Sequence, residues 1–125
     1  MSFEHIVADF ETCKKAAVIG LDIKSVFPQY PFPAPTAEEV PLPILEDTSQ
    51  IEYDWAFNCD RKLIFFEKSL WTEKGKETLK RKKIDDFNEA TARLKMAIWL
   101  IENVPEARQW YIDNGYLKEV SNDRD

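Results

Sequence analysis

The stretch from Ile84 to Val104 constrains the fold more than any other part of the chain. Its mostly apolar residues recur at steps of three and four, the spacing that places side chains on one face of an α-helix. They are Phe87, Ala90, Thr91, Leu94, Ala97, Ile98 and Ile101, and Met96, Trp99 and Leu100 widen the same face. We expect Asp85 or Asp86 to cap this helix and Pro105 to end it, because proline has no N–H for the helical ladder.

A first helix is predicted near the N-terminus, beginning at Phe3 or at Asp9 and ending at Ile19. Apolar side chains follow helical spacing here as well, and Gly20 can adopt the left-handed conformation that closes a helix. Cys13 lies on the apolar side, where a reduced thiol behaves as a small buried hydrophobic group. We expect Cys59, the other cysteine, to be a second structural thiol; a disulfide or an exposed reactive Cys59 are the alternatives.

Six of the seven prolines lie between Pro28 and Pro43, and they preclude a regular helix or strand there. Within this segment, Thr36 and Glu39 form the pattern of a capping box, which predicts one helical turn that Pro41 ends. We interpret the segment as a strap over the core; the alternative is a proline-rich ligand for a groove on another protein. The apolar residues expected to pack are Phe27, Tyr30, Phe32, Leu42, Ile44 and Leu45.

The strongest strand signal lies between residues 51 and 58. Apolar and polar or small residues alternate there with a period of two, which places one side of a strand on a core. The apolar members are Ile51, Tyr53, Trp55 and Phe57. A turn at 58–60 and a second strand at 61–68 complete a predicted hairpin.

Residues 69–75 are predicted to form a loop, and residues 76–83 a third, lysine-rich strand at the edge of the sheet. Pro105 is expected to begin a last short helix that extends to Asn114 and is closed by Gly115. Trp110, together with Ile112 or Tyr111, would return to the core.

These elements predict one domain, residues 1–125, of the α+β class. We expect a two- to three-stranded antiparallel sheet packed on a central long helix, with an N-terminal helix, a proline-rich strap and a short C-terminal helix. A chain of 125 residues can build such a core without disulfides or metal. No segment reaches the ~20 apolar residues of a membrane span, and the start lacks the basic residues of a signal peptide, so we expect a cytoplasmic protein without membrane contact.

Charge is distributed unevenly along the chain. Residues 61–83 hold nine basic and three acidic residues, a charge of +6, whereas the other residues hold eight basic and twenty acidic residues, a charge of −12. The overall charge of −6 disfavours nonspecific binding to nucleic acid. A basic segment on an acidic protein instead indicates a protein partner or self-association.

No catalytic constellation, metal site or cofactor site is predicted. The chain has no phosphate-binding loop, no dinucleotide fingerprint and no Cys or His pair at metal-ligand spacing, and its one histidine is His5. Asp85, Asp86 and Glu89 are the closest carboxylate group, and helix capping explains them without an ion.

The candidate partner-binding residues are the basic run Lys80, Arg81, Lys82 and Lys83 with the aromatic residues Trp71 and Trp110. The run could steer an acidic partner, and the tryptophans could anchor an interface, because large rings supply contact area at low entropic cost. A solvated sheet edge explains the same lysines without a partner.

Three segments resemble a widespread set of short phage and prophage proteins of uncharacterised function. They are Glu11–Ala16 before Gly20-Leu21, the turn Ala34-Pro35-Thr36-Ala37-Glu38-Glu39-Val40, and Glu89–Leu100 after the hairpin. The resemblance implies a gene carried by a phage or mobile element of bacteria, acting in the host cytoplasm, with no active site to carry over. In this chain Pro41 and Pro43 interrupt the helix that usually follows the turn, and the basic segment before Ile84 is longer.

We therefore expect a small non-enzymatic interaction protein that modulates a host or phage component. The alternative is a nucleic-acid-associated or small-ligand-binding module that uses the basic residues 74–83; a small enzyme ranks third.

Overall fold

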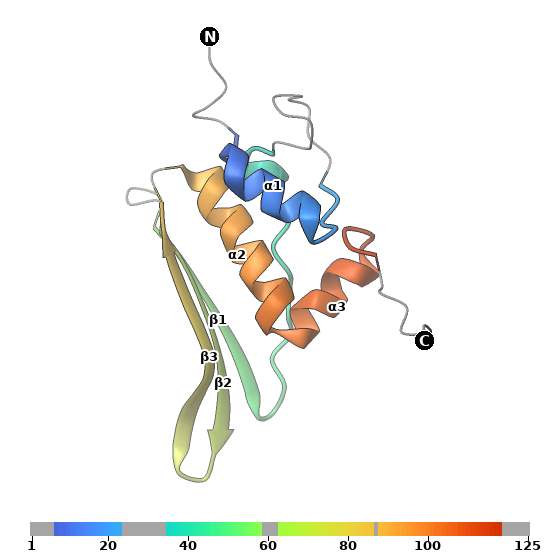
Figure 1. Ribbon diagram of the computed structural model, residues 1–125. Helices are drawn as coiled ribbons and strands as arrows, with labels where there is room; N and C mark the ends of the chain where they lie inside the picture. Colours follow the sequence, from blue (N-terminus) through green and yellow to red (C-terminus); the bar gives the residue numbers. More distant parts are fainter. Residues whose placement is uncertain (1–6, 24–34, 59–62, 87, 119–125) are drawn as a thin grey trace.

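The computed structural model describes residues 7–23, 35–58, 63–86 and 88–118 (Figure 1). Along the chain it contains helix α1 (Phe10–Val18), the 3-10 turn η1 (Ala37–Glu39), strands β1 (Ile51–Asn58), β2 (Leu63–Thr72) and β3 (Gly75–Asp85), and helices α2 (Glu89–Asn103) and α3 (Pro105–Asp113). The α+β class and the antiparallel sheet of three strands are therefore confirmed. Among the described helices, none combines the length and apolar character needed to cross a bilayer.

The sheet has the order β1-β2-β3, so β3 lies at an edge. Trp55 pairs with Phe66, and Phe66 in turn pairs with Lys82. Directly paired residues share one face, so these three side chains lie on the same side of the sheet. We call this side the inner face, because Phe66 packs there with residues of α2.

The predicted loop at 69–75 is wrong. β2 continues to Thr72, and Glu73 and Lys74 form a tight turn to Gly75, which has a φ of 113°. A glycine supplies this conformation without a steric penalty, and Leu70 and Trp71 can pair across the hairpin with Glu77 and Lys76. The hairpin of β2 and β3 consequently extends beyond the helices (Figure 1).

Helix α2 begins later than predicted. Its N-cap is Asn88, whose side-chain oxygen accepts a hydrogen bond from the Thr91 amide at 3.0 Å. The predicted cap at Asp85 or Asp86 is therefore wrong, and Ile84 and Asp85 belong to the end of β3, where they pair with Ile64 and Leu63. The C-terminal end agrees with the prediction, since Pro105 occupies the first turn of α3; Phe87 lies outside the described residues.

Two hydrophobic clusters surround α2, and this helix contributes to both. On one side its residues pack with α1, η1 and α3, through Val7, Cys13, Val40, Leu94, Ile98 and Tyr111. On the other side they pack with the sheet, through Ile64, Phe66, Ile84, Met96, Leu100 and Val104. Trp55, predicted to be buried, is only partly buried and contacts the Phe66 ring at 4.8 Å, while Phe57 is 50% exposed.

Helix α1 agrees with the later of the two predicted starts. Asp9 caps it by accepting a hydrogen bond from the Thr12 amide at 2.8 Å, and Gly20 closes it with a φ of 87°. Cys13 is buried as a free thiol, and burial, followed by the nearby Asp9 charge, raises its pKa to about 12. His5 and Cys59 lie outside the described residues.

The described part of the proline segment lies on the core. Glu39 accepts a hydrogen bond from the Thr36 amide at 2.9 Å, as the capping box predicts. The Tyr111 hydroxyl donates to the Pro41 carbonyl at 2.6 Å, and Leu42 and Leu45 pack on the sheet-side cluster. Ile44 was expected to pack as well but is 77% exposed; Phe27, Tyr30 and Phe32 lie outside the described residues.

Candidate binding groove

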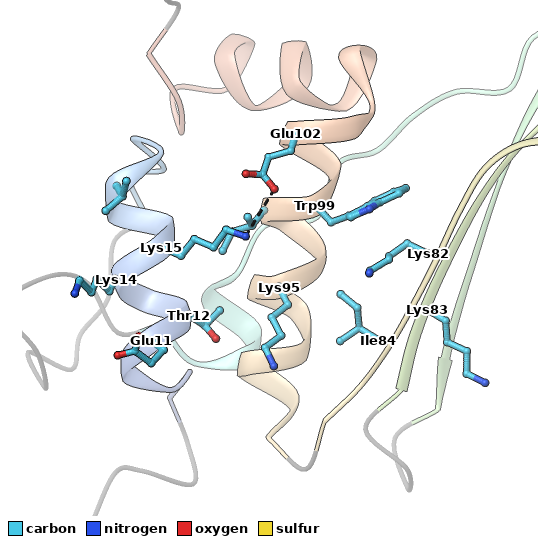
Figure 2. A pocket seen from close by; sticks show the side chains of 12 residues that line it. Glu11, Thr12, Lys14, Lys15, Lys82, Lys83, Ile84, Lys95, Trp99 and Glu102 are labelled. Atoms are coloured by element: carbon cyan, nitrogen blue, oxygen red, sulfur yellow. Dashed lines mark ion pairs between the residues drawn. The ribbon is translucent and has the colours of Figure 1, made fainter.

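A groove of about 750 Å³ opens between α1 and β3, with α2 between them (Figure 2). We call it the lysine groove, because five lysines and only two glutamates line it. These charged residues are Lys14, Lys15, Lys82, Lys83, Lys95, Glu11 and Glu102. The groove is therefore a basic concave surface on a protein of net charge −6.

The base of the lysine groove is apolar. Ile98 of α2 is 3% exposed and Ile84 of β3 is 9% exposed. Trp99 is partly buried, and its ring lies 6.3 Å from that of Phe66. A concave surface with apolar walls and a few charged groups is the common character of binding sites.

Figure 2 shows Lys15, Lys82 and Lys95 toward the interior of the groove or along its walls. Lys14 and Lys83 point away from α2. Lys15 contacts Glu102 at 3.9 Å, and Lys95 contacts Asp86 at 3.0 Å. The Lys15 and Glu102 side chains are 59% and 44% exposed, so their attraction is weakened by solvent.

Lys82 differs from these two lysines. It lies on the inner face of β3, between this strand and α2, and it is only partly buried. Within the described part of the chain, no carboxylate forms an ion pair with it. A partly desolvated ammonium group without a counter-ion favours an anion that arrives from outside.

The structure divides the predicted basic run between two faces. Lys80 and Lys82 lie on the inner face, while Arg81 and Lys83 lie on the outer face, where the Arg81 guanidinium stands 5.1 Å from the centre of the Phe65 ring. Only Lys82 and Lys83 line the groove. The four residues therefore do not form one continuous patch.

The two predicted aromatic anchors do not line the groove. Trp71 is 49% exposed near the tip of the hairpin, and its indole N–H donates to Glu52 at 2.8 Å. Trp110 is partly buried and stacks on Tyr116 at 6.0 Å. Trp99 is the tryptophan of the groove, although its helical spacing assigned it to the core.

Sequence reasoning also missed Lys15 and Lys95. Each is an exposed lysine of its own helix, and no local pattern separates it from other exposed lysines. Only the packing of α1 beside α2 brings both to the same groove as Lys82.

A second polar cluster connects the sheet to α3. The Glu106 carboxylate accepts a hydrogen bond from the Tyr53 hydroxyl at 2.6 Å and contacts the Lys68 ammonium at 2.5 Å. Burial, followed by the hydrogen bond to Glu106, raises the pKa of Tyr53 above its ordinary value. The charges of Lys68 and Glu106 neutralise each other, and we interpret the cluster as structural.

No group of three His, Cys, Asp or Glu side chains within the described ranges is placed to hold a metal ion. Of the carboxylates that the sequence brings close together, Asp86 contacts Lys95, and Glu89 contacts Arg93 at 3.2 Å. Comparisons of the chain with family models, with curated proteins and with solved structures find no match. The lysine groove is therefore the candidate functional site.

Proposed function

We propose that this protein is a non-enzymatic interaction protein that binds an acidic surface of a partner protein in the lysine groove. The observation that carries the proposal is Lys82, a partly buried ammonium group without a counter-ion in the described part of the chain. An arriving carboxylate would pair with it beside the apolar side chains of Ile84 and Trp99.

The charge distribution supports a protein partner over nucleic acid. A nucleic-acid backbone gains affinity from many lysine or arginine contacts along a track, and the acidic remainder of this chain, at −12, repels such a polyanion. A protein partner needs an acidic patch only where it meets the groove. The opposite charges would also orient the partner during its approach.

The resemblance to phage and prophage proteins extends the proposal to its setting. It favours a phage-encoded protein that acts in the cytoplasm of a bacterial host and modulates a host or phage component. A nucleic-acid-associated module is the second candidate, and the same basic residues would carry it.

A matched pair of variants tests the groove. Lys82→Glu with Lys83→Glu changes two groove residues, whereas Lys74→Glu with Lys118→Glu changes the net charge equally at two exposed positions outside the groove. We expect partner capture from a bacterial lysate to be lost with the groove variant and kept with the control. The control should melt near the wild-type temperature, because exposed charges contribute only about 0–1 kcal/mol. Since Lys82 is partly buried, the groove variant is also checked by thermal unfolding, and a cooperative transition shows that its loss of capture is not a loss of folding.

Two outcomes would contradict the proposal. If both variants capture the same proteins as the wild type, the groove is not the binding site. If nuclease treatment removes the retained material, and retention falls steeply with salt, the nucleic-acid candidate replaces the protein partner.

A further inference from the structure

The lysine groove is bordered by a strand whose second side is unpaired in the described part of the chain. β3 pairs with β2 on one side only, and Lys82, Lys83 and Ile84 of β3 form the wall of the groove opposite α1. Along an antiparallel edge strand, alternate residues direct their N–H and C=O groups away from the sheet. The groove thus has a row of backbone donors and acceptors along one wall.

The charges of β3 determine which kind of strand could pair with its free edge. Basic side chains occupy both faces, with Lys80 and Lys82 inside and Arg81 and Lys83 outside. If two copies of β3 paired in antiparallel fashion about these residues, basic side chains would face one another, and like charges in directly opposed positions are destabilising. A second copy of this edge is therefore disfavoured, and a strand whose acidic side chains face Lys82 on the inner face is favoured.

We propose that the partner contributes an extended acidic segment, which pairs with the free side of β3 as a fourth strand and lies in the lysine groove. This inference rests on the proposed function and specifies its mode of binding. Main-chain hydrogen bonds to β3 would provide affinity, and alternate side chains would provide specificity. Side chains directed inward would meet Lys82, Ile84 and Trp99, and those directed outward would meet Arg81 and Lys83.

A helix is the less favoured occupant. A paired strand needs only the ~4.7–4.9 Å spacing of neighbouring strands beside β3, whereas a helix with its side chains has a diameter of about 10–12 Å. A helix would also leave the N–H and C=O groups at the free edge of β3 without protein partners.

The test uses the full chain and a synthetic peptide probe, a blocked ten-residue peptide of alternating glutamate and valine. A lysine-valine peptide of equal length is the charge control. Two further glutamate-valine peptides carry backbone N-methyl groups. In the first peptide every valine is N-methylated, and in the second every glutamate is N-methylated. Since alternate residues of a strand direct their amides to opposite edges, each methylated peptide has one blocked edge and one intact edge.

We expect the glutamate-valine peptide to bind and to slow amide hydrogen exchange along the unpaired side of β3 at least tenfold. One of the two methylated peptides should lose at least tenfold in affinity, while the other binds as the parent does. The lysine-valine peptide should not bind. The groove variant Lys82→Glu with Lys83→Glu should weaken the parent peptide, and the Lys74→Glu with Lys118→Glu control should not.

The outcomes separate the two proposals. If the parent peptide binds through Lys82 and Lys83 but both methylated forms bind equally well, strand pairing is wrong and the groove remains a site for acidic side chains. If both methylated forms lose binding equally, or if protection appears on α1 and α2 but not on β3, the occupant is not a strand. If the parent peptide fails to bind, or binds the groove variant and the wild type alike, the proposed function fails together with its mode.

Discussion

The contact of Glu106 with the sheet allows a direct test of how α3 is held in place. Glu106 accepts a hydrogen bond from Tyr53 at 2.6 Å and contacts Lys68 at 2.5 Å, and the side chains of Glu106 and Lys68 are 30% and 19% exposed. The substitution Glu106→Gln keeps the size of the side chain and removes its charge. It therefore leaves the Lys68 ammonium partly buried without its counter-ion.

The expected cost follows from these contacts. Hydrogen bonds to charged groups contribute about 1.5–3 kcal/mol, and fully exposed ion pairs about 0–1 kcal/mol. Because this cluster is partly exposed, we expect Glu106→Gln to lower the free energy of unfolding by about 2 kcal/mol. Tyr53→Phe, which leaves the ion pair in place, should cost about 1 kcal/mol. The double variant Lys68→Met with Glu106→Gln should cost less than the sum of its single changes, since no unpaired charge remains.

The assay is urea unfolding, followed by circular dichroism, of the wild type, the single variants Lys68→Met and Glu106→Gln, and their double variant; Tyr53→Phe is measured in the same way. We expect a coupling energy of about 1 kcal/mol between Lys68 and Glu106, with unchanged m-values. Additivity of the two single changes within about 0.3–0.5 kcal/mol would refute the reasoning, because independent sites add in this way.

The same glutamate predicts a pH dependence. Burial alone would raise the pKa of Glu106, but hydrogen bonds from Lys68 and Tyr53 outweigh it, so the pKa is lower in the folded state. The unfolded chain then binds the proton more readily, and the stability that Glu106 contributes is complete above the unfolded pKa of about 4.3. It is lost as the pH falls through the folded pKa. The stability difference between wild type and Glu106→Gln should therefore shrink below about pH 4.3, and a difference that stays constant would contradict the assigned contacts.

Two further substitutions and one labelling reaction test the core. Leu94 is 0% exposed, so Leu94→Asp buries an unpaired charge and should prevent cooperative folding; a cooperative thermal transition would show that α2 faces water there. Trp55→Ala should cost about 2 kcal/mol in urea unfolding, below the ~3–5 kcal/mol of a fully buried ring, because Trp55 is only partly buried. Cys13 is buried and its pKa is raised to about 12, so it should react with a thiol reagent at pH 8 only as fast as the chain unfolds. Mass spectrometry of the modified peptide would measure the rate of labelling. Rapid labelling in the folded protein would contradict the burial of Cys13.

The sequence was informative where a local rule decides the structure. Alternation over residues 51–58 predicted β1, and the lysine-rich run predicted β3 at the sheet edge. Gly20 and Pro105 marked helix ends because a left-handed φ and a missing N–H are properties of single residues. These features require no knowledge of what packs beside them.

Where two local rules compete, the sequence alone could not decide. Ile84 and Asp85 fit the helical spacing that continues into α2, but the pairing of Ile84 with Ile64 places them in β3. Leu70 and Trp71 were assigned to a loop, and pairing across the hairpin extends β2 through them. Such choices depend on hydrogen bonds and buried area gained with distant residues, which no local window contains.

The candidate site belongs almost entirely to the tertiary structure. The sequence marked Lys80 to Lys83 as a basic run, but strand geometry divides this run between two faces and directs Lys82 toward α2. Lys15 and Lys95 carry no local signal, and they reach the groove only because α1 packs on α2. Sequence thus determined that the protein has a basic segment on an acidic chain, whereas packing decided which lysines share a concave surface, because charges far apart in the chain act together only when folding brings them close.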